Sequence, residues 1–155
     1  MTQHPGLQSA EDVFGKVERE LARLEAEVTA DTYFNFAITA YHLCDWVEKD
    51  ARLPKAARRD LKVLRRELAI QVCRDIANGS KHFGVDYPNP VVADATCTTG
   101  YGMGRFGAGA YGVGEVTIQV TLSDGSLRDG LDIAREAATL WRAFFAKHIS
   151  RGSAA

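Results

Sequence analysis

The sequence predicts an α+β fold that is mainly helical: a four-helix bundle with an antiparallel β-hairpin, or a three-stranded sheet, inserted before the last helix. Apolar residues recur at three- and four-residue steps in three stretches of the first half and in one at the end. Segment 115–122 alternates apolar and polar residues instead. A chain of 155 residues has room for one domain with one core, so residues 1–155 are expected to fold together.

Local signals place the helix ends. Ser9 followed by Asp12 resembles a capping box, so the first helix should begin near residue 10. Asp31 is the expected cap of the second helix. The third should end at Asn78-Gly79, or one turn later at His82, because a single internal Gly costs only about 1 kcal/mol. The expected helices are 10–28, 31–51, 56–79 and 130–149.

The strands are expected after the breaker Tyr87-Pro88-Asn89-Pro90. They cover 91–99 and 115–122, with 126–129 as an optional third strand. Residues 100–114 are rich in Gly and are expected to form a flexible hairpin tip. A second interpretation is that Arg105 and the aromatic residues of this tip stack on nucleic-acid bases.

Composition narrows the possible functions. Apolar residues make up 46% and charged residues 25% of the chain, which is typical of a folded protein and not of a disordered one. The formal net charge of −1 gives no global reason to bind nucleic acid or an anionic membrane. A local basic patch is one candidate exception, although such a stretch is also typical of a solvated helix face. Its residues are Arg58, Arg59, Lys62, Arg65 and Arg66.

The chain is expected to be cytoplasmic. Residues 1–12 lack the basic start and apolar run of a secretory signal, and no stretch approaches about 18 consecutive apolar residues. No membrane partner is therefore predicted. The cysteines Cys44, Cys73 and Cys97 are odd in number and form no C-x-x-C pair, which argues against disulfides and a thiolate zinc site.

Two polar stripes are the candidate functional feature. Residues three or four positions apart share one face of a helix. On the second helix these are His42, Asp45 and Trp46, beside Thr39 and Lys49. On the third helix Arg74, Asn78 and His82 are spaced by four, with Asp75 and Lys81 adjoining. If the two helices are antiparallel neighbours, the stripes can face one another.

Such a cleft, with Tyr41 and Trp46 close by, would suit phosphate chemistry. A histidine can transfer a proton near neutral pH, and Arg or Lys can stabilise charge on a phosphoryl oxygen. No metal or cofactor is needed for either role. Two alternatives stay open. The polar groups can simply satisfy one another between packed helices, or His42, Asp45, Asp75 and His82 can ligate a metal ion.

The stretch Arg74-Asp75, Asn78, Lys81-His82 resembles the signature of the HEPN superfamily, whose members are small helical bundles. Many are metal-independent ribonucleases of toxin and antiviral systems, and their dimers bring two motifs together. The resemblance covers about residues 30–85 and the last helix. Its departure is the interval between Arg74 and His82, which is longer than the usual pattern.

The resemblance implies a homodimer that binds RNA or a nucleotide. Arg74 would hold the scissile phosphate, Asp75 would orient Arg74, and His82 would transfer a proton to or from the ribose 2′-oxygen. His42, Lys81 and Asn78 would assist. The rival hypotheses are a non-enzymatic module that docks a partner protein and a metal-dependent hydrolase.

Overall fold

The computed structural model describes residues 5–82, 87–100 and 115–149, with the side chains of residues 80–82, 99, 100 and 115 excepted. The mainly helical α+β class is confirmed. Within the described residues, five helices accompany a three-stranded antiparallel sheet that lies before the last helix. The Gly-rich tip predicted at 100–114, with Arg105, lies outside these residues beyond Gly100.

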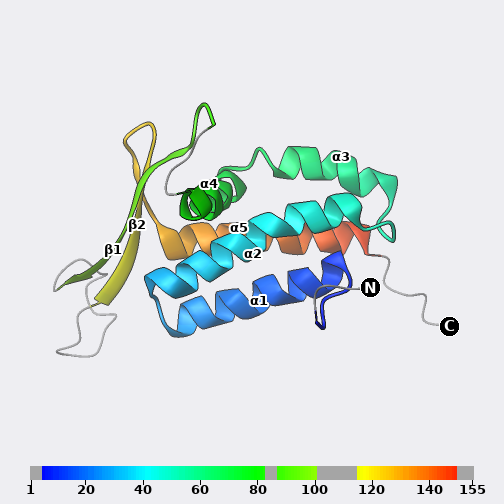
Figure 1. The fold of residues 1–155 in the computed structure, drawn as a ribbon, viewed down its shortest axis with the longest axis horizontal. Helices are drawn as coiled ribbons and strands as arrows, with labels where there is room; N and C mark the ends of the chain where they lie inside the picture. The colour runs from blue at the N-terminus through cyan, green and yellow to red at the C-terminus, as the bar shows by residue number, and fades with distance from the viewer. Residues whose placement is uncertain (1–4, 83–86, 101–114, 150–155) are drawn as a thin grey trace.

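Three long helices form the body of the molecule. They are α1 (Ala10–Ala26), α2 (Ala30–Lys49) and α5 (Gly130–His148), and they lie side by side in Figure 1. The Ser9 hydroxyl accepts a hydrogen bond from the Asp12 N–H, which confirms the predicted start of α1. The predicted cap of α2 was wrong.

Thr29, and not Asp31, caps α2. The Thr29 hydroxyl accepts from the Thr32 N–H, and the Thr32 hydroxyl accepts from the Thr29 N–H. This reciprocal pair satisfies two N–H groups that the first turn of a helix leaves without partners. Asp31 therefore lies inside the first turn, where its charge complements the helix dipole.

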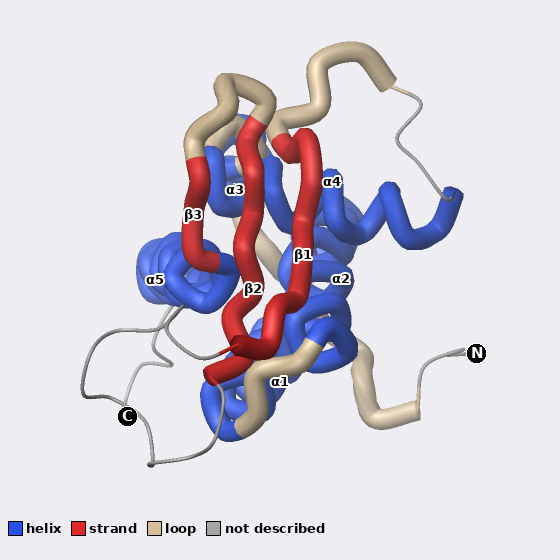
Figure 2. Tube along the Cα trace, turned by 90° about the vertical axis from the view of Figure 1, so that its left-hand side faces the viewer, coloured by secondary structure: helices blue, strands red, loops and turns tan. Residues whose placement is uncertain are grey.

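The single third helix predicted at 56–79 is two helices, α3 (Lys55–Leu64) and α4 (Leu68–His82). Between them the N–H groups of Arg66 and Glu67 bond carbonyls three residues back, which tightens the chain into a turn. Apolar residues continue at helical spacing through this turn, and no Gly or Pro interrupts them, so the sequence carries no break signal. The views in Figures 1 and 2 agree that α4 crosses α2 instead of running antiparallel to it.

The sheet covers the end of the bundle where α2 and α5 begin (Figure 2). It consists of β1 (Val92–Gly100), β2 (Glu115–Leu122) and β3 (Leu127–Asp129) in the order β1-β2-β3, so the optional third strand exists. The predicted alternation of β2 is confirmed because its inward residues are buried, namely Ile118, Val120 and Leu122. Asp129 ends β3 and caps α5 directly, with its carboxylate accepting from the Asp132 N–H.

Gly130 lies where β2 meets the first turn of α5. A Cβ at this position would stand 2.5 Å from Cγ2 of Ile118 and 3.1 Å from Cε2 of Tyr33. Contacts this short are repulsive, so the close approach of strand and helix requires a residue without a side chain.

The core is centred on α5. Trp141 is fully buried and donates a hydrogen bond of 3.0 Å to the Ala40 carbonyl of α2. Phe145 stacks on Phe14 of α1 at 4.6 Å between ring centroids. Of the helices in the described ranges, none combines the length and apolar character required to cross a bilayer.

Candidate functional site

The polar stripe of α2 lies at the surface. His42 and Asp45 are exposed, and Trp46 and Tyr41 are half-buried. The Asp45 carboxylate lies 3.7 Å from Arg65, whose guanidinium bonds Glu48 more closely at 2.8 Å. Because His42 is exposed, it is not required to satisfy a buried Asp45, and the interpretation of this pair as a buried structural contact is wrong.

A cavity of about 410 Å³ lies beside this stripe. Trp46 supplies an aromatic surface, and Lys49 and Arg52 supply positive charge. The lining also includes Gln8, Asp45, Asp50 and Ala51. This combination of a ring and two cations suits a planar anionic group, although part of the lining already serves the fold.

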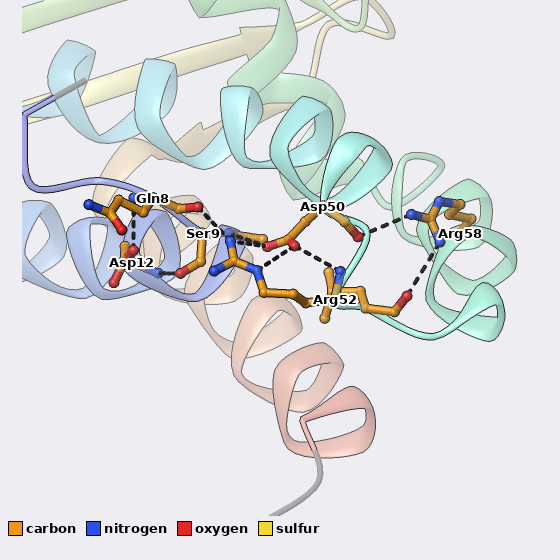
Figure 3. A network of polar contacts seen from close by, with 8 residues as sticks. Gln8, Ser9, Asp12, Asp50, Arg52 and Arg58 are labelled. Atoms are coloured by element: carbon orange, nitrogen blue, oxygen red, sulfur yellow. Dashed lines mark hydrogen bonds and ion pairs between the residues drawn. The ribbon is translucent and has the colours of Figure 1, made fainter. Parts of the chain in front are cut away.

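Asp50 uses its carboxylate to fasten the start of α1 to the end of α2 (Figure 3). It accepts hydrogen bonds from the backbone N–H groups of Ala10, at 2.9 Å, and Arg52, at 3.0 Å, and from the Arg52 guanidinium at 2.8 Å. Arg58 donates to the carbonyls of Glu48, Asp50 and Leu53, where α2 ends. Asp50, Arg52 and Arg58 therefore act as structural residues.

The Asp50 network makes stability depend on pH. Burial raises the pKa of Asp50, but the hydrogen bonds from Arg52 and Ala10 outweigh it, and the net pKa lies below its ordinary value of 3.8. A group whose pKa is lower in the folded state stabilises the fold fully above its ordinary pKa, and this stabilisation is lost as the pH falls through the folded-state pKa.

We expect wild type to have a larger unfolding free energy than Asp50→Asn at about pH 7, and this difference to be smaller at about pH 3. Urea denaturation of both proteins at both pH values measures the difference. A difference that does not change with pH would contradict the role given to the Asp50 carboxylate.

Asp75 of α4 is the centre of the second cluster. Its carboxylate is buried, and one oxygen, Oδ1, contacts Arg74 at 2.8 Å and also accepts from the Tyr87 hydroxyl. The other oxygen accepts from the N–H groups of Val91 at 2.6 Å and Val92 at 3.0 Å. Asp75 thereby joins α4 to the segment that leads into β1.

Arg74 is held in a fixed orientation by Asp75 and Tyr87. Its Nε donates to Asp75 at 2.9 Å, and its guanidinium carbon lies 4.7 Å from the centre of the Tyr87 ring. Burial lowers the pKa of Arg74, but the Asp75 carboxylate raises it on balance, so the side chain stays cationic. The side chain is 28% exposed, and among the described residues no hydrogen bond reaches its Nη1. A positioned cation thus reaches solvent.

Tyr87 extends the cluster toward Asn78. Burial and the hydrogen bond to Asp75 raise the pKa of Tyr87, and contacts with Arg74 and Asn78 lower it in part. The phenol therefore stays protonated at neutral pH. Asn78 is half-buried, four residues beyond Arg74 in α4. The side chains of Lys81 and His82 lie outside the described part of the chain, although both residues belong to α4.

Among the described residues, the two predicted stripes line no common cavity. A second cavity, of about 550 Å³, lies between the start of α2, α4 and β1, and it is lined by Asp75, Tyr33, Phe34 and Ile118 among others. It shares no residue with the cavity beside Trp46, and His42 lines neither. The reason is the crossing of α4 over α2, which replaces the antiparallel packing expected from sequence.

Metal binding and thiol chemistry find little support among the described residues. No three His, Cys, Asp or Glu side chains gather there closely enough to hold a metal ion. Burial raises the pKa of Cys44 to about 11 and that of Cys73 to about 12, so both thiols stay protonated at neutral pH.

Sequence reasoning missed Tyr87 and Asp50. Tyr87 stands in a Pro-rich breaker and so appeared to be only loop, and its contact with Arg74 spans thirteen residues. Asp50 follows the last turn of α2, and its partner Ala10 lies forty residues away. No local signal indicated a role for Asp50, because it falls inside the helix predicted at 31–51.

No family model, curated protein or solved structure matches the chain.

Proposed function

We propose that the chain is an HEPN-like domain that binds RNA at Arg74 and cleaves it without a metal. The observation that carries this proposal is the orientation of Arg74 by its neighbour Asp75, with part of the guanidinium left open to solvent. This is the role that the HEPN-like motif assigns to the polar residue after the Arg. A pre-oriented guanidinium can bind phosphate oxygens by paired hydrogen bonds.

Asp75 supports such a site by fixing Arg74 before RNA arrives. Charge that develops on a phosphoryl oxygen is stabilised best by donors that need no rearrangement. Tyr87 restricts the guanidinium further, since its ring packs against it and its hydroxyl accepts from Nε at 3.2 Å. The role of His82 in proton transfer follows from the motif alone.

A dimer fits the positions of Arg74 and His82 along α4. From Arg74 to His82 the helix rises about 12 Å. This distance exceeds hydrogen-bonding reach, so the two side chains of one chain can act on the same phosphate only if both turn toward it. A second copy of the chain would bring another Arg74 and another His82 to the RNA, as in HEPN dimers. The proposed species is therefore a homodimer.

The test is cleavage of mixed cellular RNA with and without chelator. We compare wild type with Arg74→Lys, Arg74→Ala and His82→Ala, each checked for folding by circular dichroism. Arg74→Lys keeps the charge beside buried Asp75 but loses the planar fork. We expect chelator-resistant cleavage by wild type and losses of about 100-fold or more in the folded variants.

Arg135→Lys is the matched control, because Arg135 of α5 is exposed and forms its ion pairs with Glu25 and Asp132. Its cleavage should equal that of wild type. Absence of cleavage by wild type at high concentration, or equal cleavage by the Arg74 and His82 variants, would overturn the proposed ribonuclease.

A protein-interaction module is the second candidate. It is favoured by one observation: Asp75 binds the Val91 and Val92 N–H groups, so the Arg74–Asp75 pair already has a complete structural role. In this case Arg74→Lys should lower the stability of the protein, and neither wild type nor the variant should cleave RNA. Oligomeric state and capture of a defined protein would then be the relevant measurements.

A further inference from the structure

The four exposed cations of α3 and the turn after it are Lys55, Arg59, Lys62 and Arg66. Their steps of four, three and four residues place the positions along one side of the helix. The buried residues Ala57, Leu61 and Leu64 occupy the other side. We name these four cations the α3 basic face.

Charges on this face are compensated only weakly: the carboxylate of Glu48, whose pKa is lowered mainly by Arg65 and in smaller part by Lys62, is already hydrogen-bonded to Arg65. No side-chain hydrogen bond or ion pair between described residues involves any of the four cations. The neighbouring Arg58 and Arg65, by contrast, bind helix carbonyls and Glu48. Asp60 is the one acidic residue within α3, and Lys147 at 2.6 Å and His148 at 2.8 Å already occupy its carboxylate.

The structure thus divides the basic stretch into two groups. Arg58 and Arg65 serve the fold, which explains part of its charge. The α3 basic face has no such role. Val63, which follows Lys62, is 60% exposed and adds an apolar contact beside the cations. An apolar group among cations suits a ligand with both phosphates and less polar sugars or bases.

We propose that the α3 basic face binds the phosphate backbone of single-stranded RNA. This inference rests on the proposed function and extends it, because it supplies the affinity that Arg74 alone would not give. From Lys55 to Lys62 the helix rises about 10 Å, enough to contact successive phosphates. Binding of this kind is independent of sequence and weakens with salt.

The test measures fluorescence anisotropy of a labelled oligouridine with the full chain over a salt series. Arg59→Gln/Lys62→Gln removes two cations from the face. The matched control, Arg135→Gln/Arg142→Gln, removes two exposed arginines that pair with Glu25 and Glu18. Both variants change the formal charge equally, so they differ in where the cations are lost and in whether those cations were ion-paired.

Each phosphate contact contributes about −0.7 to the slope of log affinity against log salt for a single strand. The face variant should lower the magnitude of this slope by about 1.4 and the affinity on the order of tenfold at low salt. The control should leave both unchanged. Equal slopes for all three proteins would overturn the inference.

The outcomes also separate this inference from the proposed function. RNA binding that is lost in Arg74→Lys but intact in the face variant rejects the α3 basic face and keeps the Arg74 site. If only the face variant loses RNA binding, the α3 basic face is supported as the binding site and the proposed site at Arg74 is rejected. Absence of binding by wild type rejects both. If polyglutamate, at the same concentration of charges as the RNA, displaces the RNA and binds with the same affinity, the α3 basic face would be a site for acidic peptides instead.

Discussion

Replacing Asp75 by Ala should lower the unfolding free energy by about 2 to 5 kcal/mol, because each buried donor left without its acceptor costs about 1 to 3 kcal/mol. The substitution leaves Arg74 without its carboxylate. It also leaves two backbone N–H groups, of Val91 and Val92, without their acceptor. Urea denaturation followed by circular dichroism measures the change.

Two variants control this result. Asp45→Ala removes an exposed carboxylate whose ion pair with Arg65 is long, so it should cost less than about 1 kcal/mol. Asp75→Asn keeps the size of the side chain but replaces one acceptor by a donor, and should fall between wild type and Asp75→Ala. Equal stability of Asp75→Ala and Asp45→Ala would show that the Asp75 cluster does not hold the sheet to α4.

Replacing Trp141 by Ala should cost about 3 to 5 kcal/mol, because a large ring leaves a cavity in a packed core. Trp141 is fully buried, contacts the rings of Phe144 and Phe145, and donates to the Ala40 carbonyl. Thermal and urea denaturation of the variant should both show the loss. Trp46 remains as the fluorescent probe.

Trp141→Phe separates packing from hydrogen bonding. It keeps an aromatic ring but has no donor for the Ala40 carbonyl, so a loss of about 1 to 3 kcal/mol is expected. A variant Trp141→Ala as stable as wild type would mean that α5 is not the centre of the core. Arg142→Ala, at the neighbouring exposed position, should change the unfolding free energy by no more than about 1 kcal/mol.

Most elements of the fold could be predicted because their signals are local. Apolar periodicity and the Ser9 cap identify α1, and alternation identifies β2. The division between α3 and α4 could not be predicted in this way. Its cause is tertiary: α3 packs on α2 and α5, whereas α4 also contacts β1, and these partners require different directions.

The candidate site was predictable only in part. The contact between Arg74 and Asp75 was expected from the resemblance to the HEPN signature. The remaining partners are Tyr87 and the residues at the start of β1, and no local pattern in the sequence indicates that they approach α4. The expected cleft with His42 depended on the angle between two helices, a property that spacing within each helix does not contain.

Gly130 has a consequence for how the sheet and the bundle can move. β3 passes into α5 without a linker at Asp129, and one residue later the missing side chain lets Ile118 rest against the helix backbone. No linker residues separate β3 from α5, and no free space separates β2 from α5. A tilt of β2 would therefore have to rotate α5 as well, so the sheet and this helix should move as one rigid unit and not about a hinge.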